Sequence, residues 1–280
     1  MKISIGLPNP VPGVSGRLLV DWARRAEERG FAGLATIDRI AYPNHDSLTT
    51  LAAAAGATSH IGLMTNILLA PVYPAPLLAK VAASLDQLSG GRLTLGLAPG
   101  GRPDDYELTG VAWNRRGRVF DETLAYLRTA WQDGQSVPVP VHDRRVPILI
   151  GGTSDKAVER VIAWGDGWTA GGARPDQVKP FNQRVRTAWA DAGRAGEPRL
   201  ATLAYFSLGD DAEQESRDYL SHYYAFTGDF AKIIADGALR TPEAIRAAVT
   251  AFEDAGCTEL YLDPTAARLD QVDRLADLLL

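Results

Sequence analysis

Two glycines and two hydroxyl residues stand where a predicted buried strand passes into a helix, in the run ILIGGTSDKA. Free backbone N–H groups and the positive end of a helix dipole converge at such a junction, which favours an anion. The sequence therefore predicts a phosphate-binding site at Gly151, Gly152, Thr153 and Ser154. The alternative is that Thr153 or Ser154 is an ordinary N-cap, which occurs in helices of any function.

A second glycine-rich junction lies in LSGGRLTLGLAPGG, from Leu88 to Gly101. The middle of this run is apolar on both faces, which is typical of a parallel strand covered by helices. Gly100 and Gly101 follow the strand, and Gly96 lies within it. Because glycine has no β-carbon, a flat ring could lie against the backbone where this strand ends, so Gly100 and Gly101 are candidate cofactor-binding residues. The alternative is that Gly96 only makes room for a neighbouring strand.

Polar side chains also follow the second predicted strand. Asp38 is a carboxylate at the end of that strand, directly before Arg39. A catalytic role and a local ion pair between the two are both open. His45, a few residues further on, is the one of the four histidines that we interpret as a catalytic candidate. Asp38, Arg39 and His45 therefore form the candidate catalytic set.

The sequence lacks the motifs of several other chemistries. It has no HExxH, no His-x-His in the first strand, no histidine cluster and a single cysteine, Cys257, so we predict no metal site. The phosphate-loop, dinucleotide and serine-hydrolase signatures are absent too. Lysine is absent from the ends of the fifth to seventh strands, which argues against a Schiff-base aldolase. A site for a phosphate-bearing planar cofactor, with substrate in an apolar pocket, remains.

Eight alternations of strand and helix position these junctions. Strands are predicted at 3–7, 33–37, 62–70, 93–98, 146–150, 167–170, 200–208 and 259–262. Right-handed crossovers close such a series most simply into an α/β fold, a single (β/α)8 TIM barrel over 1–280, with a doubly wound sheet as the alternative. We expect insertions after strands 4 and 7. The candidate residues follow strand ends, where barrels carry their sites.

The composition agrees with this fold and argues against nucleic acids and membranes as binding partners. The length of 280 residues is near the roughly 250 of such barrels. Hydrophobic residues at 46% and charged residues at 22% are typical of soluble proteins, and no apolar run approaches the roughly 20 residues of a membrane helix. A net charge of −5 without a basic block argues against nucleic acid. No signal peptide is visible, so we expect a cytoplasmic protein with no membrane partner.

Over nearly the whole chain the sequence resembles the luciferase-like flavin-dependent oxidoreductases. This family includes monooxygenases that use reduced FMN and reductases or dehydrogenases that use the deazaflavin coenzyme F420. Three blocks carry the resemblance: AKVAASLDQLSGGRLTLGLAPGG at 79–101, RGRVFDETLAYLRTAW at 116–131 and PILIGGTSDKAVERVIAWGDGW at 147–168. The first and third blocks, in that order within a barrel pattern, are a specific signal.

The resemblance implies where the cofactor would lie. The ring covers the C-terminal mouth of the barrel in this family, backed by a bulge of the third strand with a non-proline cis peptide. That bulge would fall here near Met64, Thr65 and Asn66, and these residues join the cofactor-binding set. The phosphate end would rest on the 151–153 segment, with Ser154 nearby. Asp38 matches an acidic or polar position after the second strand.

The resemblance predicts a monooxygenase that uses FMN and molecular oxygen to oxidise a small organic substrate, with a separate flavin reductase as partner. An F420-dependent reductase or dehydrogenase is the alternative, and a flavin-binding barrel without catalysis is a third. Two departures leave the subtype open. Many relatives have histidine where this chain has Arg39, and some have arginine or cysteine where it has Ala98 and Pro99. Relatives are often dimers, so a homodimer is a further expectation.

Overall fold

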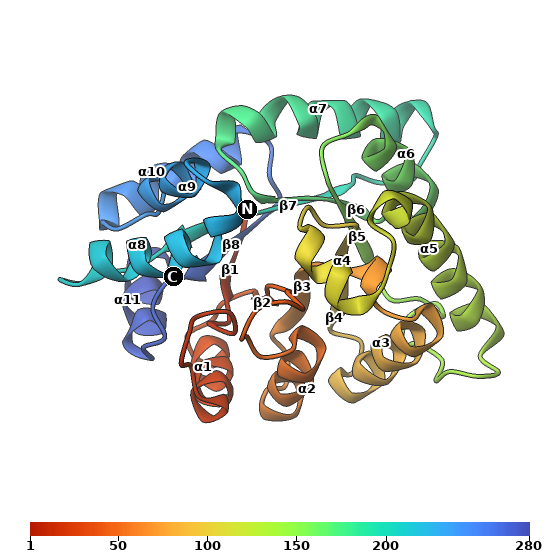
Figure 1. Cartoon of the computed structure of the whole chain (residues 1–280), viewed down its shortest axis with the longest axis horizontal. Coiled ribbons are helices and arrows are strands. Elements are labelled where there is room, and N and C mark those ends of the chain that lie inside the picture. Colours follow the sequence, from red (N-terminus) through yellow and green to blue (C-terminus); the bar gives the residue numbers. More distant parts are fainter.

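Eight parallel strands form a closed barrel in chain order, in a computed structural model that describes residues 1–280 (Figure 1). The strands are β1 Lys2–Gly6, β2 Gly33–Thr36, β3 Gly62–Leu69, β4 Leu93–Ala98, β5 Ile148–Gly151, β6 Gly167–Gly172, β7 Arg199–Phe206 and β8 Glu259–Pro264. The predicted α/β barrel is confirmed. β6 runs two residues beyond its predicted end, so Gly171 belongs to the strand.

Eight helices cover the outside of the barrel, one for each strand. They are α1 Gly16–Glu28, α2 Ser47–Ala57, α3 Ala75–Ser89, α5 Arg116–Asp133, α6 Asp155–Trp164, α7 Pro175–Asp191, α10 Pro242–Asp254 and α11 Asp270–Leu279. Local signals set their ends: Thr241 caps α10 before Pro242, and Gly90 ends α3 in the left-handed conformation. None of the helices has the length and apolar character needed to span a bilayer.

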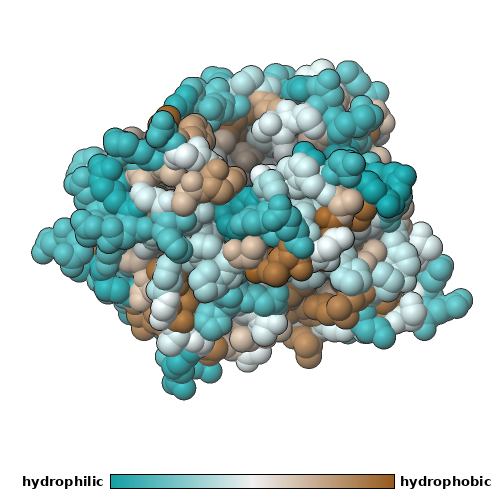
Figure 2. All heavy atoms as spheres, viewed as in Figure 1, coloured by the Kyte–Doolittle hydropathy of each residue, from teal (hydrophilic) through white to brown (hydrophobic).

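Further elements fill the two expected insertions. After β4 come α4 (Pro103–Thr109) and a 3-10 turn at Trp113–Arg115, and after β7 come α8 (Ala212–Tyr223), a 3-10 turn at Ala225–Thr227 and α9 (Phe230–Asp236). A short 3-10 turn at Ala70–Val72 also follows β3. α8 packs against α9, and the surface between α9 and α7 is hollowed (Figure 2). The insertion after β7 therefore shapes the rim of this hollow.

An ion pair occupies the N-terminal end of the barrel interior. Arg199 of β7 donates to both carboxylate oxygens of Glu259 on β8, at 2.6 and 2.9 Å, and to the Thr94 hydroxyl of β4 at 3.0 Å. Burial alone would raise the pKa of Glu259, but the bonds from Arg199 bring it below its usual value. This end of the barrel is therefore closed by a satisfied charge pair, and the opposite end is left for a site.

β3 carries one extra residue opposite β4. Thr65 pairs with Leu95, but the next pair is Leu68 with Leu97, so the register shifts between Thr65 and Leu68. The expected bulge is confirmed, and the cis peptide bond joins Asn66 to Ile67. A β-carbon on Gly96 would lie 2.1 Å from the Thr65 carbonyl oxygen. Gly96 thus makes room for the bulged strand, as the alternative interpretation had it.

We predict that Gly96→Ala lowers the free energy of unfolding by about 3 kcal/mol, because the added methyl group meets rigid backbone. Gly101→Ala is the matched control: a β-carbon there has no neighbour within 4 Å. The control is expected to change stability by less than about 1 kcal/mol. Urea denaturation of both variants measures this difference, and equal midpoints would show that β3 can retreat from the bulge.

Candidate active site

Glycines surround the β3 bulge at the C-terminal mouth of the barrel. A β-carbon on Gly151 would lie 2.6 Å from Ile67 Cδ1, and one on Gly100 would lie 2.6 Å from Leu69 Cδ2. Gly171 lies against the same Ile67 methyl group, and Gly100 and Gly171 have positive φ angles of 71° and 63°. We call Gly100, Gly151 and Gly171 the glycine rim. Glycine leaves the backbone without side chains here, so peptide groups lie directly against the half-buried Ile67.

Asn66 holds the one unpaired polar group beside this rim. Its Oδ1 accepts a hydrogen bond from the Thr169 hydroxyl at 2.7 Å, while its Nδ2 is buried without a partner. A buried amide hydrogen without an acceptor costs free energy, so it points to an acceptor supplied by a ligand. The other two predicted residues of this strand are fully buried, and the Thr65 hydroxyl donates to the Gly96 carbonyl. Met64 and Thr65 therefore support Asn66 from behind.

The β5 exit has the expected turn into α6. Gly152 has a φ of 104°, and its carbonyl accepts a hydrogen bond from the Trp168 indole at 2.7 Å. Ser154 caps α6, since its hydroxyl accepts from the Ala157 N–H at 3.3 Å. The N-cap interpretation is thus confirmed for Ser154. Thr153 is exposed beside the helix N-terminus, and the phosphate site at this turn stays a prediction.

Asp38 is buried between β2 and the turn that follows β3. Its carboxylate accepts hydrogen bonds from the Leu69 N–H and from the Tyr73 hydroxyl, both at 3.0 Å. Burial raises the pKa of Asp38 to about 6, although both hydrogen bonds act to lower it. Both carboxylate oxygens are occupied, so this side chain positions Leu69 and Tyr73 at the mouth.

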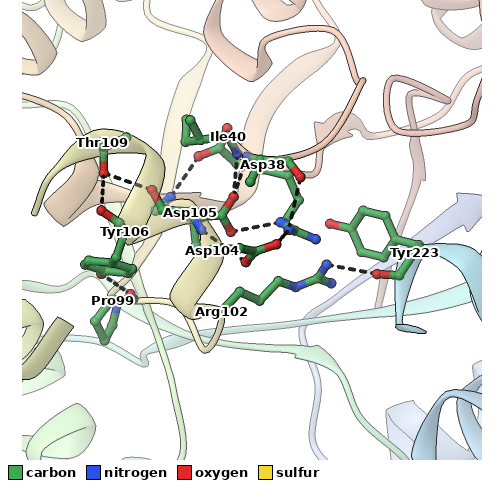
Figure 3. A network of polar contacts seen from close by, with 12 residues as sticks. Asp38, Ile40, Pro99, Arg102, Asp104, Asp105, Tyr106, Thr109 and Tyr223 are labelled. Atoms are coloured by element: carbon green, nitrogen blue, oxygen red, sulfur yellow. Dashed lines mark hydrogen bonds and ion pairs between the residues drawn. The ribbon is translucent and has the colours of Figure 1, made fainter. Parts of the chain in front are cut away.

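Arg39 points away from Asp38 and binds the first turn of α4. Its guanidinium donates to Asp105 at 2.8 Å and to Asp104 at 2.5 Å. Asp105, fully buried, also accepts from the N–H groups of Ile40 and Ala41 (Figure 3). The interpretation of a local ion pair between Asp38 and Arg39 is therefore wrong, because the acidic first turn of α4 takes the arginine instead.

A cluster of aromatic residues and one arginine covers the mouth, and the sequence interpretation did not find it. Arg102, directly before α4, donates to the Tyr223 carbonyl at 2.9 Å. Its guanidinium lies 4.2 Å from the ring centres of Tyr223 and Phe226. Figure 3 shows Arg102 reaching from α4 towards Tyr223. The run YYAF at 223–226 was the available signal. The two insertions are thus joined over the mouth.

The structure keeps His45 apart from Asp38. The imidazole of His45 is exposed, and its Nε2 is 3.0 Å from the Val14 carbonyl, in the loop between β1 and α1. The backbone of His45 is also bonded to Asn9, both through its N–H and through its carbonyl. His45 thus links two loops, and its catalytic role stays a prediction.

A further carboxyl, Asp263, lies at the end of β8. Its Oδ1 is buried without a partner, and a β-carbon on Gly6 would lie 2.3 Å from this atom. Burial raises the pKa of Asp263 well above its ordinary value. No side chain pairs with this carboxyl oxygen at the end of β8.

We predict that Asp38→Asn changes how stability depends on pH. The pKa of Asp38 rises from 3.8 when unfolded to about 6 when folded, so its favourable contribution is present below 3.8 and is lost as the pH rises through about 6. The stability of the unsubstituted protein relative to Asp38→Asn should fall by about 2 kcal/mol between about pH 4 and about pH 7. Urea denaturation across this range measures it. Parallel curves would contradict the burial of a titrating Asp38.

Known proteins resemble this chain in sequence and in fold. The sequence model described as "Luciferase-like monooxygenase" matches residues 1–276. An uncharacterized protein of Mycobacterium tuberculosis is 31% identical over 230 residues, which are 70% of this chain and 80% of the relative.

Solved structures with the same fold include the monooxygenase RslO1 from Streptomyces bottropensis, with a TM-score of 0.82, 22% identity and coverage of 99% and 97% of the two chains. An F420-dependent secondary alcohol dehydrogenase in complex with an F420-acetone adduct has a TM-score of 0.83, 18% identity and coverage of 99% and 98%. At these identities the structural likeness shows the fold alone. The sequence match covers nearly the whole chain, and the chain therefore belongs to the luciferase-like monooxygenase family, which includes flavin monooxygenases and F420-dependent reductases.

Proposed function

We propose that this protein is a flavin-dependent monooxygenase that uses reduced FMN and molecular oxygen to oxidise a small organic substrate. The observation that carries the proposal is the unpaired, buried Nδ2 of Asn66 beside the glycine rim. A flat heteroaromatic ring with acceptor atoms on its edge supplies the contact surface and the acceptor that this arrangement lacks. The residues present therefore fit a flavin ring.

Each part of the mouth would have a separate task. The glycine rim and Ile67 would support the ring, and Asn66 would donate a hydrogen bond to it. The backbone N–H groups at the start of α6, with Thr153, would hold the phosphate. Bound reduced flavin supplies the electrons for the reaction with oxygen. Arg102 and Tyr223, which join the two insertions over the mouth, would keep water from the reacting atoms.

The charges around the β5 and β6 exits support FMN over F420. Three of the cations there are already in ion pairs: Lys156 with Glu159, Arg174 with Asp176 and Arg184 with Asp155. FMN ends in one phosphate, which neutral N–H groups at a helix N-terminus can hold. F420 carries a phosphodiester and several carboxylates, which favour unpaired cations. A separate flavin reductase would supply the reduced FMN.

An F420-dependent reductase or dehydrogenase is the second candidate, and Asp38 is the observation that favours it. Hydride transfer to or from a carbonyl carbon needs a proton donor or acceptor near the mouth. Asp38 has its pKa raised to about 6, within the range in which a carboxyl exchanges protons near neutral pH. Its two hydrogen bonds to Leu69 and Tyr73 would have to be exchanged for one to substrate.

Cofactor titration of the purified protein distinguishes the two candidates. We expect FMN to raise the melting temperature and F420 to leave it unchanged, because a ligand stabilises the fold that binds it. Oxygen uptake with reduced FMN should then depend on added substrate. Stabilisation by F420 together with turnover under strict anaerobiosis would refute the monooxygenase proposal. Stabilisation without turnover under either condition would indicate a flavin-binding barrel without catalysis.

We predict that Thr153→Asp weakens FMN binding by at least about tenfold, because a carboxylate at this position repels the phosphate. Thr153→Asn is the matched control, with the same shape and no charge. Gly152 is unsuited to this test, since its φ of 104° strains any side chain. Fluorescence titration measures the affinity and the melting temperature verifies the fold. Equal affinities for the two variants would place the phosphate elsewhere.

A further inference from the structure

A cavity of about 400 Å³ lies next to the mouth, between the β6–α7 loop, β7, α9 and α10. It is the hollow seen between α7 and α9 in Figure 2. Its walls are mainly apolar, with Leu203 from β7, Ile234 from α9 and Phe252 from α10 among them. Ligand sites in proteins commonly enclose about 300 to 1,000 Å³, so this volume suits a small organic molecule.

The cavity adjoins the place proposed for the ring. Gly172, the last residue of β6, lines the cavity and directly follows Gly171 of the glycine rim. A β-carbon on Gly172 would lie 3.5 Å from Leu203 and 3.8 Å from Tyr205, both of which line the cavity. A molecule in this cavity would therefore lie within one residue of the rim.

Two tyrosine hydroxyls form the polar end of the cavity. The hydroxyl oxygens of Tyr205 on β7 and Tyr224 after α8 are 2.7 Å apart, and both residues line the cavity. The bond between them uses one of their two hydrogens, so one hydrogen is left to donate to a third group. Burial raises the pKa of Tyr224 to about 12 and raises that of Tyr205 well above its ordinary value, which favours the protonated hydroxyls.

The remaining wall offers no unpaired charge. Arg174 is the one charged residue of the lining, and its guanidinium is already bonded to both oxygens of Asp176. A charged ligand would lose its hydration here without gaining a partner, which is costly. The chemistry of the wall therefore favours an uncharged ligand.

We propose that this cavity is the substrate site, and that it takes an uncharged, mainly apolar molecule whose single carbonyl or ether oxygen accepts a hydrogen bond from the Tyr205–Tyr224 pair. The word substrate rests on the proposed function. Binding of such a molecule depends only on the cavity, so the two proposals can fail separately.

Three naphthalene probes test the assignment on the full chain, with and without FMN. 2-Acetylnaphthalene is neutral and has an acceptor, naphthalene is neutral and lacks one, and 2-naphthoate is charged. We expect the ketone to bind about tenfold more tightly than naphthalene, and naphthoate to bind least. Calorimetric titration measures the three affinities. Naphthoate binding as tightly as the ketone would overturn the proposal.

Two variants of α10 locate the binding. Ala248 lines the cavity, whereas Ala247 is exposed on the same helix. Ala248→Phe should reduce the affinity for both neutral probes at least about tenfold by filling the cavity, and Ala247→Phe should leave it unchanged. Equal affinities in the two variants would place the probes elsewhere and overturn the assignment.

The double variant Tyr205→Phe/Tyr224→Phe tests the hydroxyl pair. It should lower the affinity for the ketone to that for naphthalene and leave naphthalene binding as it was. An unchanged preference for the ketone would overturn the role of the pair. FMN affinity is titrated in parallel and reports on the proposed function. If the unsubstituted protein does not bind FMN, FMN use is refuted, while binding of the probes still supports the cavity as a ligand site.

Discussion

The extra residue of β3, opposite a strand position without a side chain, is the constraint on which the mouth depends. Residues along a strand alternate between its two faces, so one extra residue changes the direction of everything after it. The change sends Asn66 across the barrel to Thr169 of β6, a strand that is not a neighbour of β3. It also places Ile67 against the glycines of two other strands and turns the Leu69 N–H towards Asp38.

The cover of the mouth depends on a different interaction, the buried pair of Arg39 and Asp105. A buried ion pair gains little net free energy unless its remaining groups are satisfied. Asp105 meets this condition through two backbone N–H groups next to Arg39, so the start of α4 is fixed to the β2 exit. Arg102, one residue before α4, then holds Tyr223. The two insertions therefore act as one cover rather than as two independent loops.

The sequence predicts the repeating part of this molecule and misses contacts between distant residues. Hydrophobic periodicity depends on neighbours along the chain, so the strands were found within a few residues. The partner of Arg39 is 65 or 66 residues away, and no local pattern encodes it. The glycine at position 96 indicated a close contact with a neighbouring strand, but the sequence did not identify the contacting atom as the Thr65 carbonyl oxygen.

The distribution of charge at the mouth is the reason for which we propose an uncharged substrate. Groups that face the interior include an amide at Asn66, a hydroxyl pair at Tyr205 and Tyr224, and the buried carboxyl of Asp263, whose pKa burial raises. The amide and the hydroxyls can donate a hydrogen bond without carrying a charge. The full charges of Arg39 and its acids lie in the cover, where they bind each other. Burying an uncharged donor away from water costs less desolvation free energy than burying an ion. A dry interior beneath a charged cover is what the exclusion of water from reacting atoms requires.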